Sequence, residues 1–240
     1  MGKPLLDAIF FDIDDTLFST TVFADKARRA AIDAMVKAGL RTDKASCLRE
    51  LEEVLAEFSS NYGWHFDKVI SRLPKSASEG LNTSILVAAG VAAYHETKWN
   101  ELKVYDDAYE VLRWLSTKPV VRGIISAGLT IKQAEKVIRL RIQEFLSPNA
   151  IFFTDQIGIN KPNPKLYLRV LETLQLSPER TMYVGDNPPS DVDPCNAIGM
   201  VTVHNRRSGR HSEIPSRTKP RYVIANFYEL KQILEKDFGF

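Results

Sequence analysis

The chain has 240 residues, of which 44% are hydrophobic and 26% are charged, as in ordinary globular proteins with a sizeable core. That length allows one large domain or two modest ones. The formal net charge of +2 is too small to argue for a nucleic-acid partner or for binding to a membrane surface.

The first predicted element is a short buried strand over Ala8–Phe11, which ends in acidic residues. Asp12 and Asp14 project to the same side if the chain stays extended. We expect them at the C-terminal end of the strand, where open α/β sheets bind their ligands. Because two neighbouring carboxylates repel each other, the pair predicts a bound cation. Taken alone, the pattern is also typical of a solvated acidic turn.

A helical block rich in Ala, Leu, Glu, Lys and Arg fills most of the next ~90 residues. Its predicted helices are Phe23–Ala38, Lys44–Phe58 and Leu81–Leu102. Pro74 and Gly80 break the helical pattern between the second and third of them. The longest apolar run, Ile85–Tyr94, is too short to span a bilayer.

From residue 120 onward, predicted strands alternate with predicted helices. The strands are expected at Val120–Ser126, Ile151–Thr154, Thr181–Val184, Met200–His204 and Tyr222–Ala225. The helices are expected at Ile131–Leu140, Pro164–Leu174, Pro194–Ile198 and Phe227–Lys236. Thr130 and Gln133 fit a capping box at the first of these helices, and Asn163 fits an N-cap for the second.

This alternation predicts an α/β fold with a doubly wound parallel sheet. The neighbours of the first strand arrive only about a hundred residues later, so the helical block is interpreted as an insertion that returns to the sheet. We therefore expect a core domain over residues 1–19 and 103–240 and an all-helical cap over residues 20–102. The cap is expected beside the strand ends, over the carboxylates.

Further polar groups follow the predicted strands or lie on a loop beside one. Ser126 ends the second strand just before a helix, where a hydroxyl and free backbone N–H groups can bind an anion. Lys161 lies in a loop with two prolines, which could hold an ammonium against a phosphate. Asp186 and Asp191 repeat the opening pattern after an apolar strand. Singly, these residues also fit a plain turn, a surface lysine or a solvated loop.

With these polar groups in this order along the sequence, the chain resembles the haloacid dehalogenase superfamily, specifically its phosphatases with a helical cap inserted after the first strand. The matching motifs are Asp12-Ile13-Asp14-Asp15-Thr16, Ser126, Lys161 within Lys-Pro-x-Pro, and Gly185–Asp191 leading to Ala197-Ile198-Gly199-Met200. The resemblance covers nearly the whole chain. It implies a Rossmann-like core and Mg²⁺-dependent hydrolysis of a small phosphate monoester.

The resemblance also implies a role for each matched residue. Asp12 would attack phosphorus and become an aspartyl phosphate, while Asp14 would protonate the leaving oxygen and then deprotonate the attacking water. Ser126 and the backbone N–H of Ala127 would hold phosphoryl oxygens. Lys161 would neutralise charge on both the nucleophile and the phosphoryl group.

Mg²⁺ would be bound by the side chain of Asp12, the backbone carbonyl of Asp14 and Asp186. Asp191 would either bind the metal or orient a ligand, and Thr16 would brace the nucleophile loop through its hydroxyl. Charge supports this assignment independently, because these carboxylates and a phosphate dianion cannot share one pocket unless Mg²⁺ and the lysine offset them.

Two positions depart from the family pattern, and a third, Asp14, distinguishes two branches of the family. Ala127 stands where family members often have Asn, which keeps a backbone contact but removes a side-chain contact to substrate. Asp193–Asn196 replaces a helix start that often contains Gly and Ala. Asp14 is the second aspartate that the metal-free dehalogenases lack, so its presence favours phosphoryl transfer over dehalogenation.

Nucleotides, sugar phosphates, phosphoglycolate and triose phosphates are all candidate substrates. A phosphomutase of the same fold and a non-catalytic regulatory protein are the alternatives. The N-terminus lacks signal-peptide features, and Cys47 and Cys195 suggest neither a disulfide framework nor a zinc site. We expect a cytoplasmic monomer or homodimer whose partner is a small phosphorylated metabolite, not nucleic acid or a membrane.

Two groups of side chains are assigned no part in the chemistry. The aromatic and histidine residues of the cap are predicted to form its own core: Tyr62, Trp64, His65, Phe66, Tyr94, His95 and Trp99. A basic stretch late in the chain is interpreted as a solvated surface loop: Arg206, Arg207, Arg210, His211, Arg217, Lys219 and Arg221.

Overall fold

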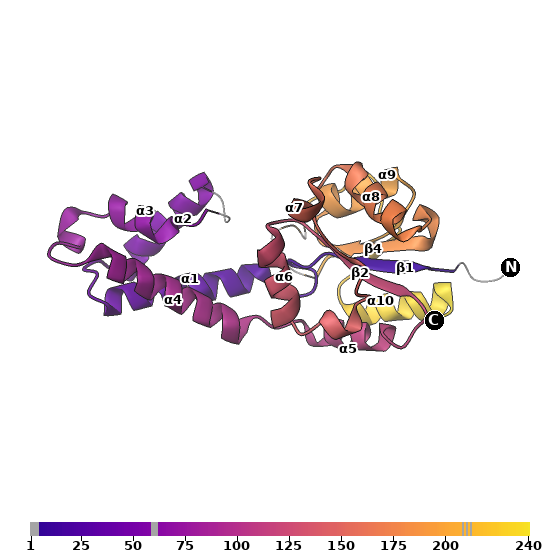
Figure 1. Cartoon of the computed structure of the whole chain (residues 1–240), viewed down its shortest axis with the longest axis horizontal. Helices are drawn as coiled ribbons and strands as arrows, with labels where there is room; N and C mark the ends of the chain where they lie inside the picture. The colour runs from indigo at the N-terminus through magenta and orange to yellow at the C-terminus, as the bar shows by residue number, and fades with distance from the viewer. Residues whose placement is uncertain (1–4, 59–61, 208, 210, 212) are drawn as a thin grey trace. The chain divides into compact units, whose positions relative to one another are not determined.

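The computed structural model describes residues 5–58, 62–207, 209, 211 and 213–240. The chain divides into two compact units (Figure 1). The core unit comprises residues 1–21 and 103–240, and the inserted unit comprises residues 22–102. Among the helices described, none is both long enough and apolar enough to cross a membrane.

The core unit is built on a six-stranded sheet with the strand order β3-β2-β1-β4-β5-β6. Its strands are β1 (Ala8–Phe11), β2 (Val121–Ser126), β3 (Ile151–Phe153), β4 (Thr181–Gly185), β5 (Val201–Asn205) and β6 (Tyr222–Ile224). Every neighbouring pair is parallel. The predicted α/β fold with a doubly wound parallel sheet is confirmed, and the strand order reverses direction at β1.

The register of the three central strands sets the position of the candidate site. Phe11 at the end of β1 aligns with Ile124 of β2 and with Val184 of β4. Because the strands are parallel, their C-terminal ends meet at one edge of the sheet. The polar residues that follow β1, β2 and β4 therefore emerge side by side.

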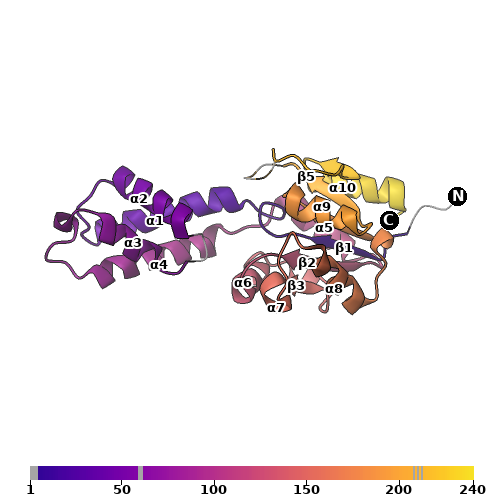
Figure 2. The same cartoon turned by 90° about the horizontal axis from the view of Figure 1, so that it is seen from above.

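Helices cover both faces of the sheet (Figures 1 and 2). One face carries α5 (Asp106–Leu115) and α10 (Phe227–Ile233), and the other carries α8 (Pro164–Leu174) and α9 (Asp193–Ala197). The short α7 (Thr154–Ile157) directly follows β3. With both faces covered, the central strand β1 is wholly apolar and buried, as expected of a strand inside a parallel sheet.

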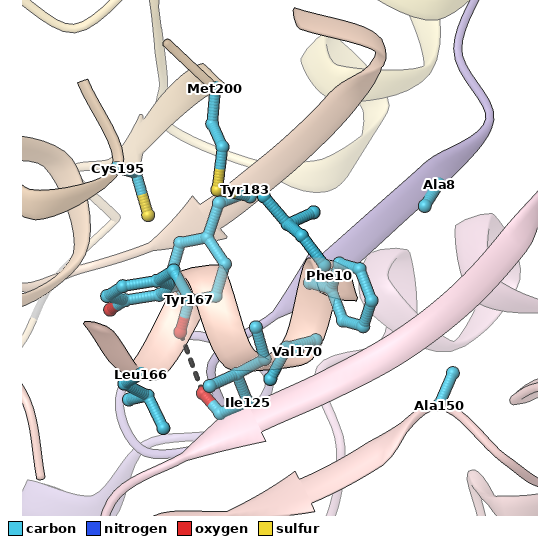
Figure 3. Close-up of a cluster of buried hydrophobic side chains, with 11 residues drawn as sticks. Ala8, Phe10, Ile125, Ala150, Leu166, Tyr167, Val170, Tyr183, Cys195 and Met200 are labelled. Carbon is cyan, nitrogen blue, oxygen red and sulfur yellow. Dashed lines mark hydrogen bonds between the residues drawn. The ribbon is translucent and has the colours of Figure 1, made fainter. Parts of the chain in front are cut away.

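Buried side chains of the sheet and of α8 and α9 form one apolar cluster (Figure 3). In it, the rings of Tyr167 and Tyr183 meet edge to face with centroids 5.2 Å apart. The Tyr183 hydroxyl donates to the Ile125 carbonyl at 2.7 Å, which satisfies a phenol that burial would otherwise penalise. A Cβ at Gly123 would lie 2.3 Å from the Phe10 ring, so only glycine allows this ring to cross β2.

The helix starts predicted from the sequence have mixed outcomes. Asn163 caps α8 as predicted, because its side chain accepts a hydrogen bond from Lys165 N at 3.0 Å. The capping box at α6 (Thr130–Arg139) is wrong, since the helix already includes Thr130 and no side chain caps it. Both the backbone N–H and the hydroxyl of Thr130 instead donate to Asp155, at 3.0 and 2.8 Å. A partner from α7 replaces the local cap.

The inserted unit is all helical and has its own apolar core. Its helices are α1 (Thr20–Lys37), α2 (Lys44–Phe58), α3 (His65–Arg72) and α4 (Thr83–Glu101). Of these, α3 was not predicted, and neither were α5 and α7 in the core unit. Phe66 packs against this core as predicted, and its ring contacts that of Tyr94 with centroids 6.4 Å apart. Trp64 and Trp99 do not belong to a core, because 64% and 67% of their surfaces are exposed.

Candidate active site

The residues that follow β1 and β4 are joined by hydrogen bonds at the carboxyl edge of the sheet. Asp12 donates its backbone N–H to Val184 O at 2.9 Å, which continues the β1–β4 pairing by one residue. Thr16 is fully buried and donates its hydroxyl to Asp186 Oδ1 at 3.3 Å. Asn205, at the end of β5, donates its side-chain amide to Thr16 O at 3.2 Å. Three strand ends are thereby linked through Thr16.

Lys161 connects the aspartates of this edge. Its Nζ lies 2.8 Å from Asp12 Oδ1, 2.8 Å from Asp191 Oδ1 and 2.7 Å from Tyr183 Oη, so all three ammonium hydrogens have acceptors. Only 6% of the side chain is exposed. Burial by itself would lower the pKa of Lys161, but the carboxylates of Asp12 and Asp191 outweigh it and raise that pKa. The lysine therefore stays charged at neutral pH.

Three buried carboxylates cluster at this edge, and two of them contact Lys161. Asp12, Asp186 and Asp191 each offer an oxygen, and these oxygens lie within 4.8 Å of one another. Burial, reinforced by repulsion from Asp12 and Asp191, raises the pKa of Asp186 to about 9. Burial also raises the pKa of Asp12 to about 6, although Lys161 opposes the shift. A single lysine cannot balance the three, and a compact set of anionic oxygens fits a hard divalent cation such as Mg²⁺.

The turn after β4 holds Asp191 in this cluster. Residues Pro188–Val192 form a wide helical turn, and Asn187 N donates to Asp191 Oδ2 at 3.0 Å. The other carboxylate oxygen, Oδ1, accepts from Lys161. A Cβ at Gly185 would lie 2.3 Å from Asp191 Oδ2, so the glycine that ends β4 is what allows the side chain to fold back over the strand end.

Asp14 is not among the three clustered carboxylates. Lys136 Nζ, from α6, lies 2.6 Å from both of its carboxylate oxygens. The Thr20 hydroxyl donates to Asp14 Oδ1 at 3.2 Å, and Gln133 Nε2 donates to Asp14 Oδ2 at 3.4 Å. The sequence singled out neither Lys136 nor Gln133 for this site. Gln133 and Lys136 are three residues apart on one helix and therefore lie on the same face of it. That spacing is the only feature of the sequence that relates them.

The turn after β2 contains Ser126 and Ala127. Ser126 is buried, and its hydroxyl donates to Gln133 Oε1 at 3.4 Å. Gln133 Nε2 in turn donates to Ala127 O at 2.8 Å. Gly128 follows with a φ of 132°, in the region that favours glycine, and its N–H donates to Thr154 Oγ1 at 3.2 Å. The predicted anion-binding turn therefore lies beside the α6 residues that contact Asp14.

The interpretation of the basic stretch as a solvated loop is wrong for two of its members. His211 Nδ1 lies 3.1 Å from Asp186 Oδ2. Arg207 lies 2.7 Å from the buried carboxylate of Asp107, and its guanidinium stacks on the Tyr105 ring. Arg210 lies outside the described residues. No spacing in the sequence relates residue 211 to residue 186; the pairing of β5 beside β4 brings this loop to the site.

Comparison with known proteins agrees with this geometry. A family model described as haloacid dehalogenase-like hydrolase matches residues 6–199. A glyceraldehyde 3-phosphate phosphatase from Methanopyrus kandleri is 40% identical, over 97% of this chain and 98% of its own length. A protein of the same name from Pyrococcus furiosus is 35% identical, over 98% of this chain and 95% of its own.

Solved structures show the same fold at lower identity. The HAD phosphatase from Thermococcus onnurineus matches with a TM-score of 0.67 at 23% identity, over 95% of this chain and 98% of that one. A structure titled putative beta-phosphoglucomutase, from Thermotoga maritima, matches with a TM-score of 0.70 at 17% identity, over 96% and 100%. At such identities the similarity concerns the fold alone.

Proposed function

Because the chain belongs to the haloacid dehalogenase-like hydrolase family and is a phosphatase of that family, we propose that it hydrolyses glyceraldehyde 3-phosphate through an aspartyl phosphate on Asp12. Five similar proteins carry the name glyceraldehyde 3-phosphate phosphatase, at 32–40% identity. This triose phosphate is one of the substrate classes expected from the sequence. The names of these relatives support the substrate, and the observation that carries the role of Asp12 is the buried Lys161 bridge between Asp12 and Asp191, next to Asp186.

In the first half of the proposed reaction, an oxygen of Asp12 attacks phosphorus. The bond between phosphorus and the bridging ester oxygen breaks, and Asp14 gives its proton to that oxygen, which leaves as the alcohol. Lys161 offsets negative charge on Asp12 and on the phosphoryl oxygens as they approach. Ser126 and the backbone N–H of Ala127 bind phosphoryl oxygens in the turn after β2.

In the second half, water attacks phosphorus and the bond to Asp12 breaks. Asp14, now a carboxylate, accepts the proton of that water. Inorganic phosphate is released, and the carboxylate of Asp12 is regenerated. Each residue returns to its initial protonation state. Splitting one difficult displacement into two steps at the same centre is what the covalent intermediate contributes.

We propose Mg²⁺ as the cofactor, held by Asp12, the backbone carbonyl of Asp14, Asp186 and Asp191. When bound, it supplies positive charge next to the phosphoryl oxygens and orients them for displacement. The fit rests on the donors: buried carboxylate oxygens within 4.8 Å of one another, too many for Lys161 alone to offset.

A phosphomutase would use the same residues, but it would return the phosphoryl group to a product. The names of the five relatives favour hydrolysis instead. The two reactions differ in one measurable respect, since a mutase depends on a bisphosphate and releases little free phosphate.

The test is release of inorganic phosphate from a panel of monoesters, with Mg²⁺ and with a chelator in excess. The panel contains glyceraldehyde 3-phosphate, phosphoglycolate, a hexose phosphate and a nucleoside monophosphate. We expect the highest kcat/KM for glyceraldehyde 3-phosphate, and loss of turnover with the chelator. A preference for another ester would contradict the proposed substrate, and turnover that survives the chelator would contradict the proposed cofactor.

Mg²⁺ is expected to raise the unfolding temperature more at about pH 8 than at about pH 5.5. Without a cation, the pKa of Asp186 is raised from 3.8 to about 9, mainly by burial. The stability that its protonated form contributes is therefore fully present below about pH 4 and is lost as the pH rises through about 9. Since the metal binds the carboxylate form, its affinity increases over the same range.

The control for this measurement is a pair of Asp→Asn variants followed by thermal unfolding. Asp186→Asn should remove most of the Mg²⁺-induced shift. Asp25→Asn changes an exposed carboxylate paired with Arg29 and should keep that shift. An equal shift at both pH values in the unmodified protein would rule out these carboxylates as the metal site.

A further inference from the structure

Lys136 of α6 makes a two-oxygen contact with Asp14 that the proposed reaction does not explain. Its Nζ lies 2.6 Å from both oxygens of that carboxylate. Only 15% of the Lys136 side chain is exposed, and the ammonium also lies 5.9 Å from the centre of the Phe18 ring. A surface lysine held by solvent-exposed charges would lose little by moving away. This one is enclosed by an aromatic ring and a carboxylate that belong to the same loop after β1.

Gln133, one helical turn before Lys136, links the same carboxylate to the phosphate-binding turn. Its Nε2 donates to Ala127 O at 2.8 Å and to Asp14 Oδ2 at 3.4 Å, and its Oε1 accepts from Ser126 Oγ at 3.4 Å. The side chain is 5% exposed. Helix α6 thus carries two adjacent side chains that bind Asp14, and one of them also binds the turn that receives the phosphoryl group.

We propose that Lys136, which contacts the same carboxylate as Gln133, is a positioning residue that orients the Asp14 carboxyl towards the leaving-group oxygen. The inference rests on the proposed function, because it concerns the step in which Asp14 gives its proton to the bridging oxygen as the P–O bond breaks. Proton transfer requires that the donor oxygen lie within hydrogen-bond reach of the acceptor. An aspartate side chain has two rotatable bonds, and contacts from α6 and from Thr20 fix both.

This role predicts that the loss on mutation depends on the leaving group. An alkyl phosphate such as glyceraldehyde 3-phosphate expels a poor leaving group that needs the proton. In 4-nitrophenyl phosphate the phenolate departs without one. A misaimed Asp14 should therefore slow the alkyl ester far more than the aryl ester, whereas general damage to the fold would slow both alike.

The experiment measures kcat and KM of the full chain for both esters with Mg²⁺ present. Lys136→Met is expected to lower kcat for glyceraldehyde 3-phosphate about 100-fold, and for 4-nitrophenyl phosphate about fivefold or less, with little change in either KM. Lys136→Arg keeps the charge and should recover part of the loss. Lys118→Met is the matched control, because Lys118 precedes β2 at the opposite edge of the sheet and packs on Trp114.

The two proposals fail in different ways. If the unmodified protein released no phosphate from either ester, the proposed function would fall, and this inference with it. If the unmodified protein is active and Lys136→Met slows both esters equally, or slows neither, only the role of Lys136 is overturned. Should Lys136→Met fail to fold, Lys136→Gln retains a hydrogen-bond donor without the charge and undergoes the same comparison.

Discussion

Asp12→Asn is expected to reduce phosphate release by a factor on the order of 10⁴ or more. The amide has the shape of the carboxylate but is a far poorer nucleophile towards phosphorus. Asp12 is buried beside Lys161, and the amide oxygen can still accept from that ammonium, so the fold should persist. Steady-state phosphate release and a far-UV melting curve measure the two effects separately.

A covalent readout separates this loss from simple damage to binding. Acid quenching during turnover should trap a phosphoryl group on the peptide that contains Asp12, and the trapped group should be absent from Asp12→Asn. Asp7→Asn is the matched control, because Asp7 lies at the other end of β1 and pairs with Arg180 on the surface. Activity of Asp12→Asn close to that of the unmodified protein would show that another group is the nucleophile.

Lys161→Met is expected to damage both stability and turnover. It leaves Asp12 and Asp191 buried without their shared cation, and breaking such a buried pair lowers the free energy of unfolding by about 3–5 kcal/mol. The same change removes the charge that faces the phosphoryl group, so kcat should fall on the order of 10³-fold. Urea unfolding and phosphate release measure the two losses.

Mg²⁺ separates the two effects of Lys161→Met. The metal should recover part of the lost stability, because it also offsets the carboxylates, but it should leave turnover low, because the ammonium itself is missing. Lys165→Met provides the control: that lysine is exposed, it is the second residue of α8, and its loss should change neither quantity. A Lys161→Met variant with normal kcat would exclude the lysine from the proposed reaction.

Local patterns identified much of the site because each pattern lies within a few residues. The apolar run before Asp12 predicted β1, and α2 spans Lys44–Phe58 as predicted. The acidic residues after β4 were predicted from the apolar strand that precedes them. Strand-ending carboxylates are visible in a sequence because hydrophobic runs and charges mark both sides of the boundary.

The capping box at α6 shows where local reasoning fails. Thr130 and Gln133 have the spacing of a box, yet Thr130 is bound by Asp155 of α7, and Gln133 is bound by Ala127 in the turn that precedes the helix. For Thr130, hydrogen bonds to a carboxylate 25 residues away take the place of the local cap. The sequence shows which residues can cap the helix, but it does not show which hydrogen-bond partners they have in the folded protein.

Hydrophobic periodicity and the order of the motifs were enough to predict the parallel α/β architecture, the order of the strand-ending polar residues and their resemblance to a phosphatase family. Which of these residues contact one another is visible only in the folded core unit. Lys161 bonds Asp12 across 149 positions, Lys136 bonds Asp14 across 122, and His211 reaches Asp186 across 25. The physical reason is that parallel pairing aligns the C-terminal ends of β1, β2, β4 and β5, while hydrophobic periodicity specifies each strand alone and says nothing of its neighbours.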